Sequence, residues 1–181
     1  MLTTGRRLPR CAASALAVAA LLATSARPSP AAERTLPQPR YAIRIAHDAT
    51  AGTLRRVLDG ARERLAETRC QEVLDTFSDL EGQPLRHRLD GLGQTPTSYL
   101  DLIIFYDGRK HPRCAVKNVL AVTHVGSRIV YICPRQLDAR ARRNPRWTEA
   151  TLIHEALHTL GLGENPPSSQ EITKTVMRQC R

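Results

Sequence analysis

The chain has 181 residues, of which 41% are hydrophobic and 4% aromatic, and its formal net charge is +10. That length suffices for one domain with its own core, and after residue 32 no apolar run reaches the roughly 18 residues of a membrane span. The positive charge raises nucleic acid as a partner, but the scarcity of aromatic residues and an export-type leader argue against it.

Residues 1–32 are predicted to be a signal peptide and not part of the fold. The stretch "MLTTGRRLPR" has three arginines and no acid, and the apolar run "CAASALAVAALLA" follows it. Small residues after this run allow cleavage after Ala26 or near Ala31–Ala32. We therefore expect one domain over residues 33–181 in a secreted or periplasmic protein.

The first half of this domain predicts a strand, a long helix and a second, buried strand. Residues 41–46 alternate with the period of a half-buried strand. Between 51 and 66 apolar residues recur at helical spacing, with arginines and acids on the other face. A short helix is expected within 84–93, and the apolar, β-branched segment "LDLIIFYDG" at 100–108 predicts a buried strand.

The second half predicts a hairpin and a late helix. The segment "VLAVTHVGSRIVYIC", residues 119–133, divides at Gly126–Ser127 into two strands. The basic run 135–146 is interpreted as a solvated connection, or alternatively as a basic rim beside the site. Residues 147–160 form a helical pattern that starts at Asn144–Pro145. The order of strands and helices predicts an α+β fold.

Four cysteines follow the leader, and an even number in an exported chain indicates two disulfides. The favoured pairing is Cys114–Cys133, which joins neighbouring segments, with Cys70–Cys180, which ties an early helix to the C-terminus. Other connectivities stay open. A cysteine zinc site is not expected, because the chain has no CxxC pair.

Two histidines in the late helix form the candidate site. His154 and His158 are four residues apart, so both can point at one ion from the same helix face, and Zn²⁺ prefers such nitrogen ligands. Glu155 is displaced from His154 by about 100° around the helix axis, where it can contact a metal-bound water. This HExxH pattern indicates metal-activated water with Glu155 as general base. The alternative is a pair of ordinary helix histidines.

A carboxylate further along the chain is the expected third ligand. Gly161 and Gly163 allow the helix to stop and the chain to double back, which brings Glu164 toward the histidines. Glu171 is the rival ligand. Because Ser168 and Glu171 have the S-x-x-E spacing of a capping box, a helix start explains Glu171 adequately, and Glu164 is favoured.

The stretch "HEALHTLGLGE" resembles the metzincin branch of the zincin metallopeptidases, with a glutamate in place of the third histidine. The resemblance implies a zincin-like fold, with a twisted mixed β-sheet, an early backing helix and a late HExxH helix. It also implies that residues 119–124 are an edge strand that binds the substrate backbone, with 128–133 as its inner neighbour. The expected Met-turn is poorly matched, since Met177 lies in a helical pattern, where core packing explains it.

These patterns together predict an exported zinc metallopeptidase. We expect one Zn²⁺ per chain, held by His154, His158 and Glu164, with a peptide or protein as substrate and Glu155 as general base. His124, on the expected edge strand, is a candidate to orient substrate or stabilise an oxyanion, although a partly buried strand histidine is the simpler interpretation.

Two other classes of function stay open. One is a non-catalytic, zinc-stabilised secreted binding or structural protein, whose site would be closed by a fourth ligand such as Glu171. The other is a zinc hydrolase of non-peptide amides such as those of cell walls. The sequence does not predict an oligomeric state.

Overall fold

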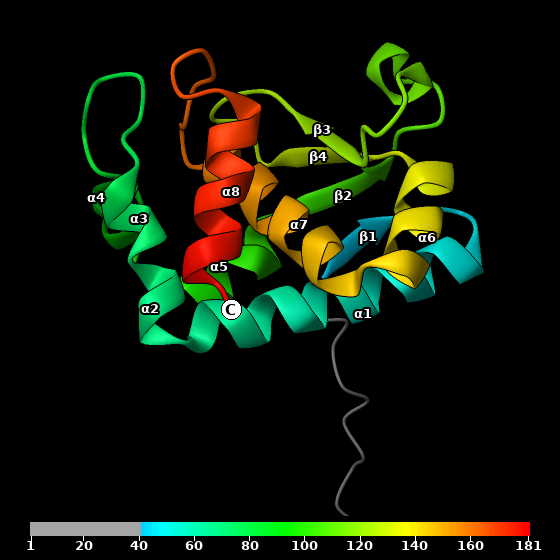
Figure 1. The fold of residues 1–181 in the computed structure, drawn as a ribbon, viewed down its shortest axis with the longest axis horizontal. Coiled ribbons are helices and arrows are strands. Elements are labelled where there is room, and N and C mark those ends of the chain that lie inside the picture. The colour runs from blue at the N-terminus through cyan, green and yellow to red at the C-terminus, as the bar shows by residue number, and fades with distance from the viewer. Residues whose placement is uncertain (1–40) are drawn as a thin grey trace, which may run out of the picture. The chain divides into compact units, whose positions relative to one another are not determined.

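The computed structural model describes residues 41–181, in which four short strands form one mixed sheet with helices packed against it (Figure 1). The strands are β1 (Ala42–Arg44), β2 (Ile104–Asp107), β3 (Ala121–Thr123) and β4 (Ile129–Ile132). Their order across the sheet is β1-β2-β4-β3, with β1, β2 and β4 parallel and β3 antiparallel to β4 at one edge.

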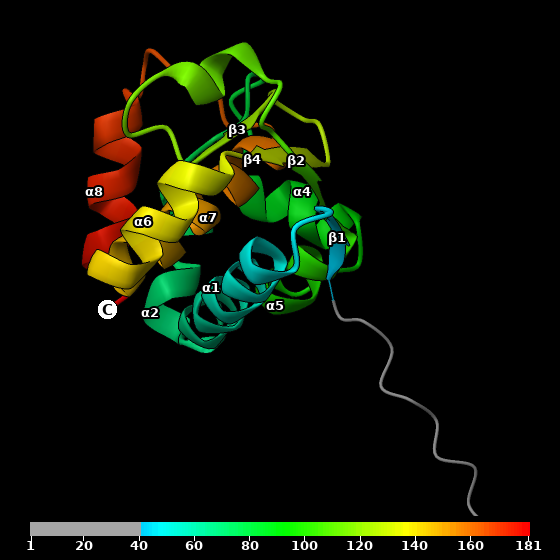
Figure 2. The same ribbon diagram turned by 90° about the vertical axis from the view of Figure 1, so that its right-hand side faces the viewer.

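The helices of the described residues are α1 (Asp48–Ala66), α2 (Thr68–Gln71), α3 (Val73–Thr76), α4 (Leu85–Gly91), α5 (Pro96–Tyr99), α6 (Pro134–Arg143), α7 (Pro145–Thr159) and α8 (Ser169–Gln179), with the 3-10 turns η1 (Leu100–Leu102) and η2 (Pro112–Ala115). Helices α1, α6 and α7 lie against one another (Figure 2). The α+β class is therefore confirmed, and so is the hairpin in which 119–124 supplies the edge strand and 128–133 its inner neighbour.

The amphipathic sequence pattern of α1 explains which of its residues are buried. His47 caps its N-terminus, where the imidazole accepts a hydrogen bond from the backbone N–H of Thr50. Leu54, Leu58 and Ala61 are fully buried, as their spacing predicts. They belong to the same hydrophobic cluster as alternate residues of the strands and the inner face of α7.

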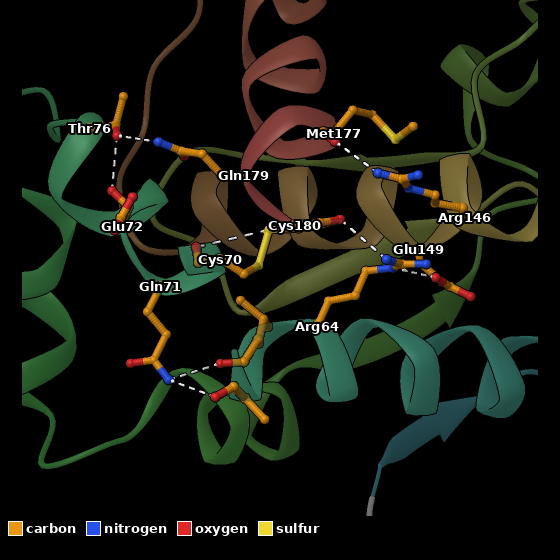
Figure 3. The surroundings of a disulfide bond; sticks show 12 residues. Arg64, Cys70, Gln71, Glu72, Thr76, Arg146, Glu149, Met177, Gln179 and Cys180 are labelled. Carbon is orange, nitrogen blue, oxygen red and sulfur yellow. Dashed lines mark hydrogen bonds and ion pairs between the residues drawn. A yellow bond between two sulfur atoms is a disulfide. The ribbon is translucent and has the colours of Figure 1, made fainter. Parts of the chain in front are cut away.

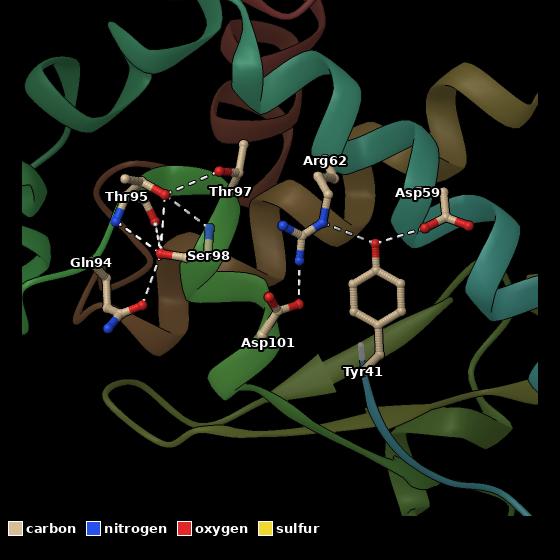
Figure 4. Close-up of polar contacts among 8 residues, drawn as sticks. All are labelled: Tyr41, Asp59, Arg62, Gln94, Thr95, Thr97, Ser98 and Asp101. Carbon is tan, nitrogen blue, oxygen red and sulfur yellow. Dashed lines mark hydrogen bonds and ion pairs between the residues drawn. The ribbon is translucent and has the colours of Figure 1, made fainter. Parts of the chain in front are cut away.

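Polar contacts join Tyr41, the residue before β1, to helix α1 and the turn η1 (Figure 4). The hydroxyl of Tyr41 donates to Asp59 at 2.9 Å and accepts from Nε of Arg62 at 3.2 Å. Arg62 also forms an ion pair with Asp101 in η1. These bonds connect β1, α1 and η1 at the edge of the core.

Both expected disulfides are present, Cys70–Cys180 and Cys114–Cys133. The first ties α2 to the end of α8, and Arg64 strengthens the same junction by donating to the carbonyl oxygen of Cys180 at 3.2 Å (Figure 3). The second joins η2 to the residue before α6. A disulfide that closes a long loop limits the unfolded chain strongly, and Cys70–Cys180 spans 110 residues.

The interpretation of 135–146 as a solvated connection is wrong, because α6 occupies most of it. Pro134 stands in the first turn, where it costs no hydrogen bond. Leu137 is fully buried, and Asp138 accepts a 2.8 Å hydrogen bond from the hydroxyl of Thr50 in α1. These two inward contacts hold the segment as a helix, and most of its arginines are left on the outside.

The predicted leader, residues 1–32, lies outside the described residues. Within residues 41–181, no helix is both long and apolar enough to cross a bilayer.

Candidate metal centre

Helix α7 carries the HExxH motif into the middle of the protein. Asn144 caps it by accepting a hydrogen bond from the backbone N–H of Trp147 at 3.0 Å, and Pro145 follows in the first turn. The helix packs against α1, α6, α8 and β3, so its whole C-terminal half is buried. Burial therefore extends to polar positions that an isolated amphipathic helix would expose.

The end of α7 is a glycine-dependent turn that reverses the chain. Gly161 has a φ of +115°, which L side chains rarely adopt. Its N–H donates to the carbonyl of His158, and the N–H of Leu162 donates to that of Leu157, which is the hydrogen-bond pattern of a Schellman motif. The turn lets Leu162 pair with Asp79 and brings Glu164 back over the helix.

Three donor atoms converge beyond this turn. Nε2 of His154 lies 2.8 Å from Nε2 of His158, and Oε1 of Glu164 lies 3.6 and 3.3 Å from these two nitrogens. Ligands at 2.0–2.1 Å from a tetrahedral ion are about 3.3 Å apart. The two carboxylate distances are close to this separation, whereas the two nitrogens must move about 0.5 Å apart to bind one ion. With that small adjustment the His154–His158–Glu164 group can hold one metal ion.

The other ring nitrogen of each histidine already has a partner. Nδ1 of His158 lies 2.7 Å from the carbonyl oxygen of Leu162. A carbonyl only accepts, so this nitrogen carries the proton, and Nε2 of neutral His158 presents its lone pair to the site. The buried carbonyl thereby fixes the tautomer of His158 whose Nε2 is able to bind a metal ion.

Nδ1 of His154 lies 2.8 Å from the hydroxyl of Thr173 in α8. When this hydroxyl accepts, Nε2 of His154 is also unprotonated, and two lone pairs face each other at 2.8 Å. A cation between them removes the repulsion. In the metal-free protein the other tautomer of His154 removes it, with Thr173 donating to Nδ1 and His154 donating to Nε2 of His158.

Burial shifts the proton affinities of two neighbouring groups in the motif. Desolvation, followed by the nearby His158, lowers the pKa of His154 from 6.5 to about 3. Desolvation, followed by the charge of Glu164, raises the pKa of Glu155 from 4.5 to about 8. A backbone hydrogen bond from Thr123 opposes this rise. Both shifts favour the neutral forms, as expected where charge is removed from water.

A cleft of about 840 Å³ opens onto the three donor atoms and Glu155. One wall is β3, which pairs with β4 on one side only. Leu120 accepts a hydrogen bond from Cys133 toward β4, so the backbone groups of Ala121 and Thr123 point the other way, into the cleft. Helix α8 contributes side chains to the same cleft, Thr173 among them.

The geometry distinguishes between the two glutamates that the sequence offered as third ligand. Glu164 lies with His154 and His158, whereas Glu171 accepts a 2.8 Å hydrogen bond from the backbone N–H of Ser168 and completes a capping box at the start of α8. The hydroxyl of Ser168 also donates to this carboxylate at 2.7 Å, and the two bonds, the hydroxyl's first, hold it at the helix end and lower its pKa. Within residues 41–181 Glu171 joins no metal-ligand group.

Several residues near the site were not assigned from the sequence. Thr173 and the carbonyl of Leu162 orient the histidines. The Thr173 contact is tertiary and joins residues 19 positions apart, whereas the Leu162 contact is local and belongs to the turn that ends α7. His111 also lines the cleft, where it stacks on Tyr131 at 5.0 Å. His124, which the sequence did single out as a candidate to orient substrate, also lines the cleft. It is exposed and follows the last residue of β3, so its simpler interpretation as a partly buried strand residue is wrong.

Met177 lies in α8, not in a turn, and packs against the core while also lining the cleft.

Comparisons with protein-family models, curated proteins and solved structures find no match to this chain. The site therefore defines the class of the protein by its chemistry alone: a disulfide-bonded α+β domain with a His–His–Glu group that can hold a metal ion.

Proposed function

We propose that this chain is an exported, zinc-dependent metallopeptidase with a zincin-like fold. The observation that carries the proposal is the convergence of His154, His158 and Glu164 at the floor of a cleft, with Glu155 beside them. The site combines metal ligands, a buried carboxylate and an unpaired strand edge. Peptide hydrolysis uses all three.

The donor set favours zinc as the metal. Two imidazole nitrogens and one carboxylate oxygen are a common ligand set of catalytic zinc, which keeps its fourth position open. A bound Zn²⁺ would supply a Lewis acid that lowers the pKa of water and polarises a carbonyl oxygen. Among residues 41–181 the group contains three ligands and no fourth, which favours an open catalytic site over a closed structural one.

Glu155 is the proposed general base. Its side chain lines the cleft. In its ionised form it accepts a proton from the water that attacks the scissile carbonyl carbon. It then delivers that proton to the leaving amine nitrogen. A cation held by the neighbouring histidines favours this ionised form, which burial alone disfavours.

The free edge of β3 is the proposed substrate platform. The N–H and C=O of Ala121 and the C=O of Thr123 are directed into the cleft and are not used by β4. An extended peptide can add to this edge as a further strand. That placement would carry its backbone past Glu155, which lines the same cleft as β3.

An oxidising compartment is the proposed location. Two disulfides persist in secreted and periplasmic proteins and are rare in the reducing cytosol. The leader-like residues 1–32 agree with export.

The first test is the metal content of the oxidised protein, purified without added metal and measured by mass spectrometry. We expect about one zinc per chain. Absence of bound metal even after incubation with zinc would mean that the histidines form an ordinary hydrogen-bonded pair. The proposal would then fail.

The second test replaces the proposed base. Glu155→Gln should retain zinc and lose about 10²–10⁴-fold in hydrolysis of an unfolded protein substrate. Glu63→Gln, which neutralises an exposed carboxylate on α1, is the matched control and should keep full activity. A Glu155→Gln protein that turns over at the wild-type rate would refute the mechanism. Cleavage of cell-wall amides without cleavage of peptides would favour the non-peptide alternative.

A further inference from the structure

A second cavity lies next to the cleft and has no part in the proposed peptidase chemistry. Its volume is about 390 Å³, within the roughly 300–1,000 Å³ of pockets that take small ligands. One wall is the outer face of α6, and the other is the segment 115–120. Asn118 and Leu120 line both the cavity and the cleft, while the three metal ligands line only the cleft.

All the charged residues that line this cavity are positively charged. Four cations line it and no carboxylate does; they are Lys117, Arg135, Arg140 and Arg143. On α6, positions 135, 139, 140 and 143 fall on one helix face, which concentrates the arginines there. Within residues 41–181 none of the four cations takes part in an ion pair. Their mutual repulsion falls when a multiply charged anion sits among them.

The two walls are tied together before any ligand arrives. Cys133, the residue before α6, is disulfide-bonded to Cys114, the residue before the other wall. Gln136 donates a 2.7 Å hydrogen bond to the carbonyl of Cys114, and Arg140 donates to the side chain of Asn118 at 3.4 Å. A pocket held in this way loses little conformational entropy on binding, which favours affinity.

We propose that this cavity binds a phosphate-bearing anion. The forked guanidinium group of arginine matches the oxygens of a phosphate, and lysine adds a point charge. A phosphate group carries about 1.5–2 negative charges, which suits four cations better than the single charge of a carboxylate. The anion is either a soluble phosphate compound or a phosphate lipid headgroup. This site is independent of the metal centre.

The chain contains a reporter for this binding. Trp147 is its single tryptophan, and the guanidinium carbon of Arg140 lies 4.9 Å from the centre of that ring. An anion that draws Arg140 away should change the tryptophan fluorescence. Inorganic pyrophosphate is the probe, titrated into the oxidised full chain at constant ionic strength, with calorimetry as an independent readout.

We expect saturable binding that weakens about tenfold when one charged partner is removed, in Arg135→Gln or Arg143→Gln. Arg142→Gln is the matched control, because Arg142 is exposed on the same helix and does not line the cavity. It should bind as the wild type does. Lack of saturation in both readouts, or equal weakening in Arg142→Gln and Arg135→Gln, would overturn the proposal.

The same titration after dialysis against a chelator separates this site from the metal centre. We expect unchanged affinity, and loss of binding with the metal would place the anion in the cleft and overturn the proposal. Competition by vesicles of phosphatidylglycerol then distinguishes the sources. Displacement of pyrophosphate by the vesicles supports a lipid headgroup, and retention supports a soluble phosphate; both agree with a phosphate site.

Discussion

The hydroxyl of Thr173 lies 2.8 Å from Nδ1 of His154, so the last helix of the chain holds a histidine of the motif helix. Residues 19 positions apart in sequence thereby form one unit. Such an outer partner fixes the ring orientation and raises the basicity of a metal-binding histidine.

Removal of this partner should weaken metal binding. Thr173→Val keeps the shape of the side chain and deletes the hydroxyl, and we expect about 10–100-fold lower zinc affinity. Competition with a chromogenic chelator measures it. Thr175→Val, two positions along the same helix, is the control. If both variants bound zinc as tightly as the wild type, the contact would have no role in the site.

The third ligand can be identified by comparing two glutamates. Glu164→Ala should lower zinc affinity by more than the roughly 10–100-fold of an outer partner, because a ligand atom itself is lost. Glu171→Ala removes part of the capping box of α8, so it should lower the melting temperature while leaving zinc affinity unchanged. The reverse pattern, with zinc lost only in Glu171→Ala, would contradict the placement of Glu164.

Gly161 is expected to be intolerant of a side chain. A residue at φ +115° is strained, and a Cβ there would lie 3.0 Å from Cβ of Asp79. Gly161→Ala should therefore cost roughly 1–3 kcal/mol of stability and also weaken zinc binding, because the turn carries Glu164. Gly52→Ala is the contrasting control: its Cβ meets only ordinary contact in α1, so it should be neutral or slightly stabilising. Urea denaturation compares the two, and equal effects would mean that the turn is not glycine-dependent.

The metal-free protein should lose stability toward both acid and base because of His154 and Glu155. His154 has a pKa of about 3 when folded and 6.5 as its reference, so the unfolded chain binds the extra proton and stability falls as the pH drops below 6.5. Glu155 has a folded pKa of about 8 against a reference of 4.5, so the folded chain holds the extra proton and stability falls as the pH rises above 4.5. Each contributes about 1.4 kcal/mol per pH unit within its window.

Between pH 4.5 and 6.5 the two slopes oppose each other, which leaves a plateau from this pair. Denaturant unfolding of chelator-treated protein across about pH 3–8 measures the profile. Glu155→Gln should remove the decline between pH 6.5 and 8, and it should also replace the plateau by an acid decline that begins at pH 6.5, because the His154 slope is then unopposed. Saturating zinc should also flatten the alkaline side, since a cation favours ionised Glu155. An alkaline slope that is equal in wild type and Glu155→Gln would show that Glu155 is not its source.

Much of this protein follows from local sequence patterns, because hydrophobic periodicity and helix-end chemistry act between near neighbours. Alternation and helical spacing predicted α1, α7 and the β3–β4 hairpin. Capping chemistry predicted the start of α8. Cysteine count and segment order favoured the disulfide pairing that is present. The HExxHxxGxxE spacing was enough to group Glu164 with the two histidines, since one helix and one turn set their positions.

The tertiary structure decided what depends on contacts between distant segments. Residues 135–146 suggested a solvated connection because of their arginines, yet most of the segment is helix α6. Leu137 is buried in the core and Asp138 is hydrogen-bonded to Thr50 of α1, and these tertiary contacts stabilise the helix. Thr173 reaches His154 only because α8 packs along α7. The burial that raises the pKa of Glu155 comes from surrounding elements, not from its neighbours in sequence. Spacing along the chain determines which residues can meet on one helix, but burial and charge depend on every element packed around them.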